Sequence, residues 1–303
     1  MKILLLGANG MLGSQFSKLL SKDLFADGLE LLALARNNVD ITSYKNLESE
    51  FRGFEPDVVL NCVAYTNVDD AEYTEEKKTA FDVNADGARN IATLCKKFDA
   101  KMIHFSTDYV FDGAKALPDG YDEDAACNPL NVYGESKLKG EQLIEKELYN
   151  YYIVRTSWLY GPRNEVRTGN FVDTMLKLGG EVLSGERDEL GVVDDQFSSP
   201  TYTGDLAHAV IDEFLVPMGS GNSEQTPESG IYHLKNEGIT SWHEFAVEIF
   251  RISEMEVPVK KISTAEFARP AKRPTNSLLL NTKLPKMRDW REALASYLYK
   301  SQD

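Results

Sequence analysis

The fold is decided near the N-terminus by Lys2-Ile-Leu-Leu-Leu-Gly7-Ala-Asn-Gly10-Met-Leu-Gly13. The apolar run before Gly7 is typical of a buried parallel strand. The three glycines permit a tight turn, a close approach of a pyrophosphate to the backbone, and close packing of the next helix on the strand. The free N–H groups of that helix would face the phosphates. The segment therefore predicts a dinucleotide site rather than an ordinary glycine-rich turn.

The next two predicted strands continue this unit. Residues 29–35 form the second strand, which ends at Arg36, where many NAD-binding chains carry an acid that holds the ribose. An arginine there can accommodate a 2′-phosphate, which favours NADPH over NADH, although Asp40 lies close by on the expected adenine side. Residues 56–66 are expected to form the third strand and the loop that follows it, whose small residues leave room for a cofactor.

A second signal lies at Tyr133 and Lys137 in Pro-Leu-Asn-Val-Tyr-Gly-Glu-Ser-Lys. Residues four apart share one face of a helix, so the phenol and the ammonium would point into the same space. A nearby cation moves the pKa of a phenol toward working pH, as a general acid needs. Thr107 follows the strand predicted from Lys101, at the edge where open α/β sheets bind ligands. Together these residues predict a Thr-Tyr-Lys catalytic set. The pair alone has a simpler reading as an exposed helix pair.

Composition excludes several classes of function. The chain has 303 residues, is 42% hydrophobic and carries a net charge of −15, which makes nucleic acid an unsuitable partner. Its apolar runs stay well short of the ~20 residues that a membrane span needs. Three scattered cysteines fit a reducing cytosol, so a cytoplasmic location is expected. The histidines are interpreted as structural, and no metal is predicted; they are His104, His208, His233 and His243.

Several motifs follow one another in an order that resembles the extended short-chain dehydrogenase/reductases and, more narrowly, the dTDP-4-dehydrorhamnose reductase family. After the glycine turn come Ser106-Thr-Asp-Tyr-Val-Phe-Asp-Gly113, Pro129-Leu-Asn-Val-Tyr-Gly-x-x-Lys137, Arg155-Thr-Ser-Trp-Leu-Tyr-Gly161, Gly169-Asn-Phe-Val172, Val193-Asp-Asp-Gln-x-x-Ser-Pro-Thr201, Gly230-Ile-Tyr-His-Leu234, Ser241-Trp-x-Glu-Phe-Ala246 and Arg273-Pro-x-Asn-Ser277. The resemblance spans essentially the whole chain.

The resemblance implies reduction of the C4 keto group of dTDP-4-dehydro-β-L-rhamnose to dTDP-L-rhamnose with NADPH or NADH. Tyr133 would donate the proton, Lys137 would lower the pKa of that tyrosine and hold the nicotinamide ribose, and Thr107 would polarise the carbonyl. The expected cofactor-binding residues are Gly7, Gly10, Met11, Leu12, Gly13, Arg36, Asp40, Ile41, Ala64, Tyr65, Thr66, Tyr133 and Lys137. The expected substrate-binding residues are Thr107, Asp108, Trp158, Asn170 and Arg273.

One position separates the chain from a neighbouring class of enzymes, and another departs from the pattern of the family itself. Related 4,6-dehydratases carry a glutamate where this chain has Tyr109, so dehydration is disfavoured. Some family members bind Mg²⁺ at a dimer interface through a glutamate where this chain has Gln15, and a neutral amide is a poor ligand for that ion. We expect a monomer or a homodimer.

The predicted fold is α/β, with a Rossmann-like doubly wound parallel sheet and a smaller C-terminal substrate domain. Residues 1–160 form the NAD(P)-binding domain, with a returning segment at about 192–215, and residues 161–191 and 216–303 form the substrate-binding domain. The cationic candidates for a diphosphate are Arg163, Arg167, Lys272 and Arg273.

Two other functions remain open from the sequence. A cofactor-binding regulatory subunit, similar to the beta subunit of methionine adenosyltransferase, can keep Thr107, Tyr133 and Lys137. A reductase of another keto-sugar nucleotide would also share these residues.

Overall fold

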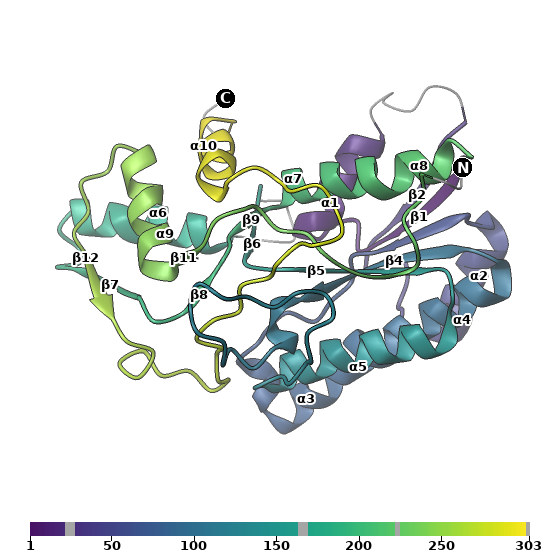
Figure 1. Ribbon diagram of the computed structural model, residues 1–303, viewed down its shortest axis with the longest axis horizontal. Coiled ribbons are helices and arrows are strands. Elements are labelled where there is room, and N and C mark those ends of the chain that lie inside the picture. The colour runs from purple at the N-terminus through teal and green to yellow at the C-terminus, as the bar shows by residue number, and fades with distance from the viewer. Residues whose placement is uncertain (22–27, 163–168, 222–224, 301–303) are drawn as a thin grey trace.

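The structure is a computed structural model that describes residues 1–21, 28–162, 169–221 and 225–300. Six parallel strands form its central sheet, with helices on both faces (Figure 1). This confirms the predicted doubly wound α/β fold. In spatial order the strands are β10 (Gly230–His233), β5 (Tyr151–Thr156), β4 (Lys101–Thr107), β3 (Val58–Asn61), β1 (Lys2–Leu6) and β2 (Glu30–Leu34).

The strand order reverses between β1 and β3. From β1 the chain moves outward to β2, then returns to the other side of β1 to form β3 and continues away through β4 and β5. In open α/β sheets, the crevice at the carboxyl ends of the strands beside such a reversal is where ligands bind. The glycine turn after β1 lies at this point.

Each face of the sheet is covered because alternate residues of a strand point to opposite faces. Ile3 and Leu5 pack in a core with α1 and α7, whereas Leu4 and Leu6 pack in a second core with α2, α4 and α5. Figure 1 shows the two helical layers on opposite sides of the sheet. The helices are α1 (Met11–Leu20), α2 (Tyr44–Phe54), α3 (Thr74–Phe81), α4 (Ala88–Phe98), α5 (Val132–Glu147), α7 (Thr203–Val210) and α8 (Val216–Gly219).

A π-helical turn at Asp82–Gly87 joins α3 to α4. The buried Asn84 lies within this turn. Its Oδ1 accepts a hydrogen bond from the N–H of Tyr65 at 2.9 Å, and its Nδ2 donates to Ser136 Oγ at 2.9 Å. The turn therefore ties the loop after β3 to the first turns of α5.

The C-terminal part of the chain adds a second, smaller core. Tyr160, Phe245 and Trp290 pack together there, and a capping box formed by Ser241 and Glu244 begins α9. The elements are α6 (Phe171–Leu183), α9 (Trp242–Ile252), α10 (Trp290–Lys300), the parallel pair β7 (Leu190–Val193) and β12 (Val259–Ile262), and the short pairs β6 (Leu159–Tyr160) with β9 (Thr201–Tyr202) and β8 (Phe197–Ser198) with β11 (Thr240–Ser241).

One segment departs from the expected division of the chain. The strand β10, which the sequence analysis placed in the substrate domain, pairs in parallel with β5 and closes one edge of the central sheet. A four-residue strand after a long polar stretch gives too little local signal to show which sheet it joins. The division into two domains otherwise stays a prediction. Over the described ranges, none of the helices has the length and apolar character that crossing a membrane requires.

Candidate active site

The glycine turn brings the start of α1 close to the carboxyl ends of β1 and β3. Gly7 has φ = 84°, a conformation that suits glycine, and a Cβ atom there would lie 2.9 Å from the carbonyl carbon of Cys62. A Cβ at Gly13 would collide with the carbonyl oxygen of Gly7. Gly10, at the N-cap, brings no side chain to cap the helix. The N–H groups of Met11, Leu12 and Gly13 thus begin α1 at a place suited to a diphosphate.

A cavity of about 410 Å³ opens beside this turn. It lies between the ends of β1, β2 and β3, as expected for the adenosine half of a dinucleotide site. The predicted residues that line it are Gly7, Arg36, Asp40, Ile41, Ala64 and Tyr65. Thr66, also predicted, is exposed in the loop just beyond. Sequence reasoning missed Thr79, Asp82 and Val83, because only the fold brings the end of α3 and the π-helical turn to this cavity.

Thr107 and Tyr133 each contact Tyr109, which follows the end of β4. Thr107 is the last residue of that strand, and its Oγ1 accepts a hydrogen bond from the N–H of Tyr109 at 3.2 Å. The Tyr109 ring meets the half-buried Tyr133 edge-on, with 6.0 Å between ring centroids. Asn131 caps α5 by accepting from the N–H of Gly134 at 2.8 Å, which confirms that Tyr133 and Lys137 lie in the first turns of a helix.

Lys137 is fully buried and reaches the backbone of β4. Its Nζ donates to the carbonyl oxygen of Phe105 at 2.6 Å and lies 3.2 Å from His104 Nε2. Burial lowers the pKa of Lys137 to about 8, against the opposing attraction of Glu141. This amine therefore changes charge close to the working pH of a cell, as a proton-handling group should.

Asp108 joins the main sheet to the C-terminal region. Its buried carboxylate accepts hydrogen bonds from the hydroxyls of Thr107 at 3.1 Å, Ser198 at 3.4 Å and Ser277. Burial raises the pKa of Asp108 to about 7, and the bond from Ser277 opposes that rise. Substrate binding by Asp108 stays a prediction; in the structure this aspartate holds Ser198 and Ser277 beside the end of β4.

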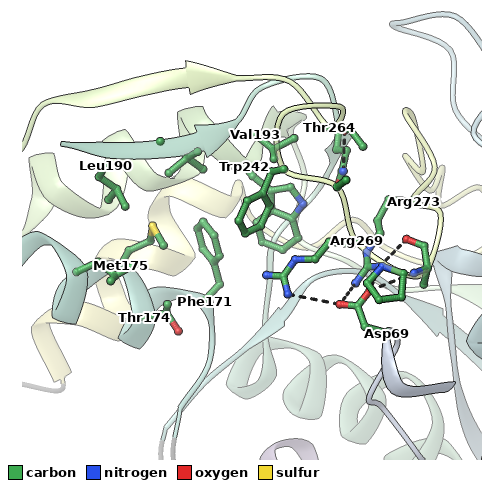
Figure 2. Close-up of a pocket in the computed structure, with 18 of the residues that line it drawn as sticks. Asp69, Phe171, Thr174, Met175, Leu190, Val193, Trp242, Thr264, Arg269 and Arg273 are labelled. Carbon is green, nitrogen blue, oxygen red and sulfur yellow. Dashed lines mark hydrogen bonds and ion pairs between the residues drawn. The ribbon is translucent and has the colours of Figure 1, made fainter. Parts of the chain in front are cut away.

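A larger cavity of about 730 Å³ faces this site from the C-terminal region (Figure 2). Trp242 and Phe171 form its aromatic wall, with ring centroids 4.5 Å apart. Trp158 stacks on Trp242 at 3.5 Å and 7°, so the predicted Trp158 supports the wall from behind. Sequence analysis included Trp242 only as part of the Ser241-Trp-x-Glu-Phe-Ala246 motif and missed its place in the cavity.

The polar end of this cavity is mostly cationic. Arg273 Nη2 donates to Asp69 Oδ2 at 2.9 Å, and Arg269 lies 3.6 Å from the same carboxylate. Arg187 and Lys272 also line the cavity. Arg163 and Arg167, the other predicted diphosphate ligands, lie outside the described residues.

Asn170 has a local structural use. Its Oδ1 accepts from the N–H of Val172 at 2.8 Å to cap α6, and its Nδ2 donates to the carbonyl oxygen of Gly161 at 2.7 Å. Substrate binding by Asn170 stays a prediction. In the described ranges, no group of three or more His, Cys, Asp or Glu side chains is placed to hold a metal ion.

The sequence matches a protein family along almost its whole length. The model of that family, described as the RmlD substrate binding domain, covers residues 1–302. The chain belongs to this family. It is 38% identical to the dTDP-4-dehydrorhamnose reductase of Aggregatibacter actinomycetemcomitans, over 97% of each chain. It is also 38% identical to the spore coat polysaccharide biosynthesis protein SpsK of Bacillus subtilis, over 98% of this chain and 96% of that one.

One similar protein has a solved structure that contains a cofactor. The dTDP-4-dehydrorhamnose reductase of Bacillus anthracis, determined in complex with NADP, is 36% identical to this chain and covers 99% of both, with a TM-score of 0.85. The family resemblance found in the sequence is thereby confirmed.

Proposed function

We propose that the protein is an NAD(P)H-dependent oxidoreductase that reduces the C4 keto group of dTDP-4-dehydro-β-L-rhamnose to dTDP-L-rhamnose, with Tyr133 as the proton donor. The observation that carries the proposal is the position of Lys137: fully buried, bonded to the end of β4, and one helical turn from Tyr133. The names of the family's reductases supply the substrate class.

The residues of the first cavity fit a nicotinamide dinucleotide. The start of α1 would hold the diphosphate, and Arg36 would face the 2′-phosphate of NADPH, with Asp40 and Ile41 on the adenine side. When bound, the reduced nicotinamide supplies the hydride. Arg36 is exposed at the rim, so its positive charge is free to orient toward a phosphate. We therefore propose NADPH as the preferred cofactor.

The chain's own part in the reaction is to supply and direct a proton. Tyr133 would donate it to the oxygen on which negative charge develops, and the Thr107 hydroxyl would donate a hydrogen bond to the same oxygen. In its ammonium form, Lys137 would favour the tyrosinate left behind. The Thr107 hydroxyl is shared with Asp108 in the structure, and its donation to substrate would replace that bond.

The second cavity fits the nucleotide-sugar substrate. Its aromatic wall suits the flat base or the apolar face of a sugar, and its cationic end suits a diphosphate. Four cationic side chains and one carboxylate line the cavity of a protein whose net charge is −15. The cavity is thus locally positive in a negatively charged protein, which supports the proposal that the substrate is an anion. The cytoplasmic location and the monomeric or homodimeric state stay predictions.

The test follows the absorbance of NADPH, and separately of NADH, with purified protein and dTDP-4-dehydro-L-rhamnose. Tyr133→Phe should reduce turnover by roughly 10²–10⁴-fold, the range expected for loss of a general acid. The matched control is Tyr149→Phe, because Tyr149 is 87% exposed in the loop just after α5 and its replacement should leave activity unchanged.

Two results would contradict the proposal. Equal turnover in Tyr133→Phe and wild type would remove the tyrosine from the chemistry. Absence of turnover with either cofactor, in a protein that binds NADPH, would instead direct attention to other keto-sugar nucleotides.

A further inference from the structure

A buried row of three polar side chains runs from the end of β3, across β4, to Lys137 on α5. Asn61 ends β3, and it lies directly opposite His104 in the pairing of β3 with β4. Asn61, His104 and Lys137 are each about 1% exposed. Asn61 Nδ2 lies 2.9 Å from His104 Nδ1, and His104 Nε2 lies 3.2 Å from Lys137 Nζ. Neither Asn61 nor His104 takes part directly in the proposed reaction.

A backbone N–H group determines which atoms donate and which accept along this row of hydrogen bonds. The N–H of Val63 donates to Asn61 Oδ1 at 3.1 Å, so the carbonyl side of the amide faces Val63. The Nδ2 side then faces His104, and an amide nitrogen can only donate. His104 Nδ1 must therefore accept, which places the single proton of the neutral imidazole on Nε2. Burial lowers the pKa of His104 well below its usual range, with a smaller contribution from Lys137, so the ring is neutral near pH 7.

The consequence falls on Lys137. His104 Nε2–H is a donor, so its contact with Nζ is a hydrogen bond only when Nζ offers a lone pair. A neutral amine can accept from His104 and still donate to the Phe105 carbonyl oxygen. If Lys137 were an ammonium, its N–H groups and the His104 Nε2–H would both be donors, and no hydrogen bond could form across the 3.2 Å between the two nitrogens. The contact with His104 therefore makes the ammonium less stable than in an ordinary lysine, but with a pKa of about 8 the ammonium that favours the tyrosinate is still present at neutral pH.

The other groups that face Lys137 do not reverse this preference. Glu141, one turn further along α5, favours the ammonium, but its carboxylate is already bound by Arg155 Nη2 at 2.6 Å and by the Ser106 hydroxyl. Cys62 faces the amine from the end of β3, and burial raises the pKa of that thiol, so it is uncharged near neutral pH.

We propose that Asn61 and His104 are positioning residues that set the charge of Lys137: Asn61 fixes the His104 tautomer, and His104 stabilises the neutral amine. The kinetic meaning of this pair rests on the proposed function, because Lys137 acts on Tyr133 only if the protein is a reductase of this type. The tautomer and the charge themselves do not depend on any substrate.

The decisive variant is Asn61→Asp. A carboxylate still accepts from the Val63 N–H, but it also accepts from Nδ1–H, so the His104 proton moves to Nδ1. Nε2 then accepts from the lysine ammonium, and the Lys137 pKa should rise by about one pH unit or more. The matched variant Asn61→Leu adds no charge. Leucine removes the amide that keeps the His104 proton on Nε2, so the Lys137 pKa should rise by a smaller amount than with aspartate. If aspartate acted only through its charge, the Lys137 pKa would not rise with leucine.

The measurement is NMR on the protein without substrate. The ¹⁵N shifts of His104 report which ring nitrogen carries the proton, and the ¹³Cε shift of Lys137, assigned by its loss in Lys137→Arg, reports the lysine pKa. We expect the Nε2–H tautomer in wild type and the Nδ1–H tautomer in Asn61→Asp, with the alkaline limb of the kcat profile moving upward with the Lys137 pKa.

Three outcomes overturn the proposal. The first is a wild-type ring protonated on Nδ1, which needs no variant to be detected. The second is a ring that stays Nε2–H in both variants. The third is a switched tautomer with an unchanged Lys137 pKa. Because these readings use the protein alone, they are separate from a failure of turnover, which would instead count against the proposed reaction.

Discussion

Lys137 and Arg155 are two fully buried cations that lie near the same carboxylate, Glu141, and they are partnered in different ways. Arg155 holds Glu141 with Nε at 3.0 Å and Nη2 at 2.6 Å. Lys137 instead donates to a neutral carbonyl oxygen and faces a neutral imidazole. Burial alone would lower both pKa values, but Glu141 raises the pKa of Arg155, whereas that of Lys137 falls to about 8. A carboxylate partner fixes a buried charge, and neutral partners leave it able to change.

Replacing Lys137 gives the largest expected change in activity. Lys137→Met keeps the length of the side chain and removes the amine, so turnover should fall by roughly 10²–10⁴-fold, as for loss of an acid–base group. Stability at pH 7 should hold to within about 1 kcal/mol, because relief of a buried charge offsets the lost bond to Phe105. Steady-state kinetics and urea unfolding measure the two effects. A loss of several kcal/mol in stability would show that Lys137 is a structural cation like Arg155.

Replacing Arg155 should give the opposite pattern. Arg155→Met leaves Glu141 buried without its cation, which costs about 3–5 kcal/mol of unfolding free energy. The folded fraction should lose far less turnover than Lys137→Met. The double variant Arg155→Met/Glu141→Met removes both charges and should recover most of the lost stability in urea unfolding. If the double variant is as unstable as the single one, the unpaired carboxylate is not the cause.

The contrast between the two cations shows what the sequence could and could not predict. Local patterns gave the glycine turn, the Tyr133–Lys137 helix face and Thr107 at a strand end, because each depends on residues within a few positions of one another. The Asn61–His104 pair was missed, and His104 was interpreted only as structural. Its significance depends on the register of β3 against β4, 43 positions apart. The same holds for β10, whose place beside β5 is a long-range pairing.

The pH dependence of stability sharpens the comparison further. The folded pKa of Lys137 is about 8, against 10.5 for an ordinary lysine, so between these values the unfolded chain binds more protons than the folded one. Stability from this residue should therefore rise with pH from about 8 to about 10, by roughly 1 kcal/mol per pH unit. Subtracting Lys137→Met from wild type at each pH isolates the effect from titrating tyrosines. A difference that stays flat over this range would place the Lys137 pKa near its ordinary value.

The smallest expected effect concerns Arg36, an exposed cation at the rim of the first cavity. Because water already solvates its charge, Arg36→Ala should change the unfolding free energy by less than about 0.5 kcal/mol. A phosphate at the rim would still feel the loss, so KM for NADPH should rise about threefold to tenfold, which is about 0.7 to 1.4 kcal/mol. KM for NADH should stay unchanged, since NADH has no 2′-phosphate. Equal rises for both cofactors would mean that Arg36 acts on the shared part of the dinucleotide, and the preference for NADPH would then need another source.

The three cations thus separate by environment: an ion pair fixes Arg155 for stability, neutral partners leave the charge of Lys137 free to change, and exposure leaves Arg36 to act on the ligand alone.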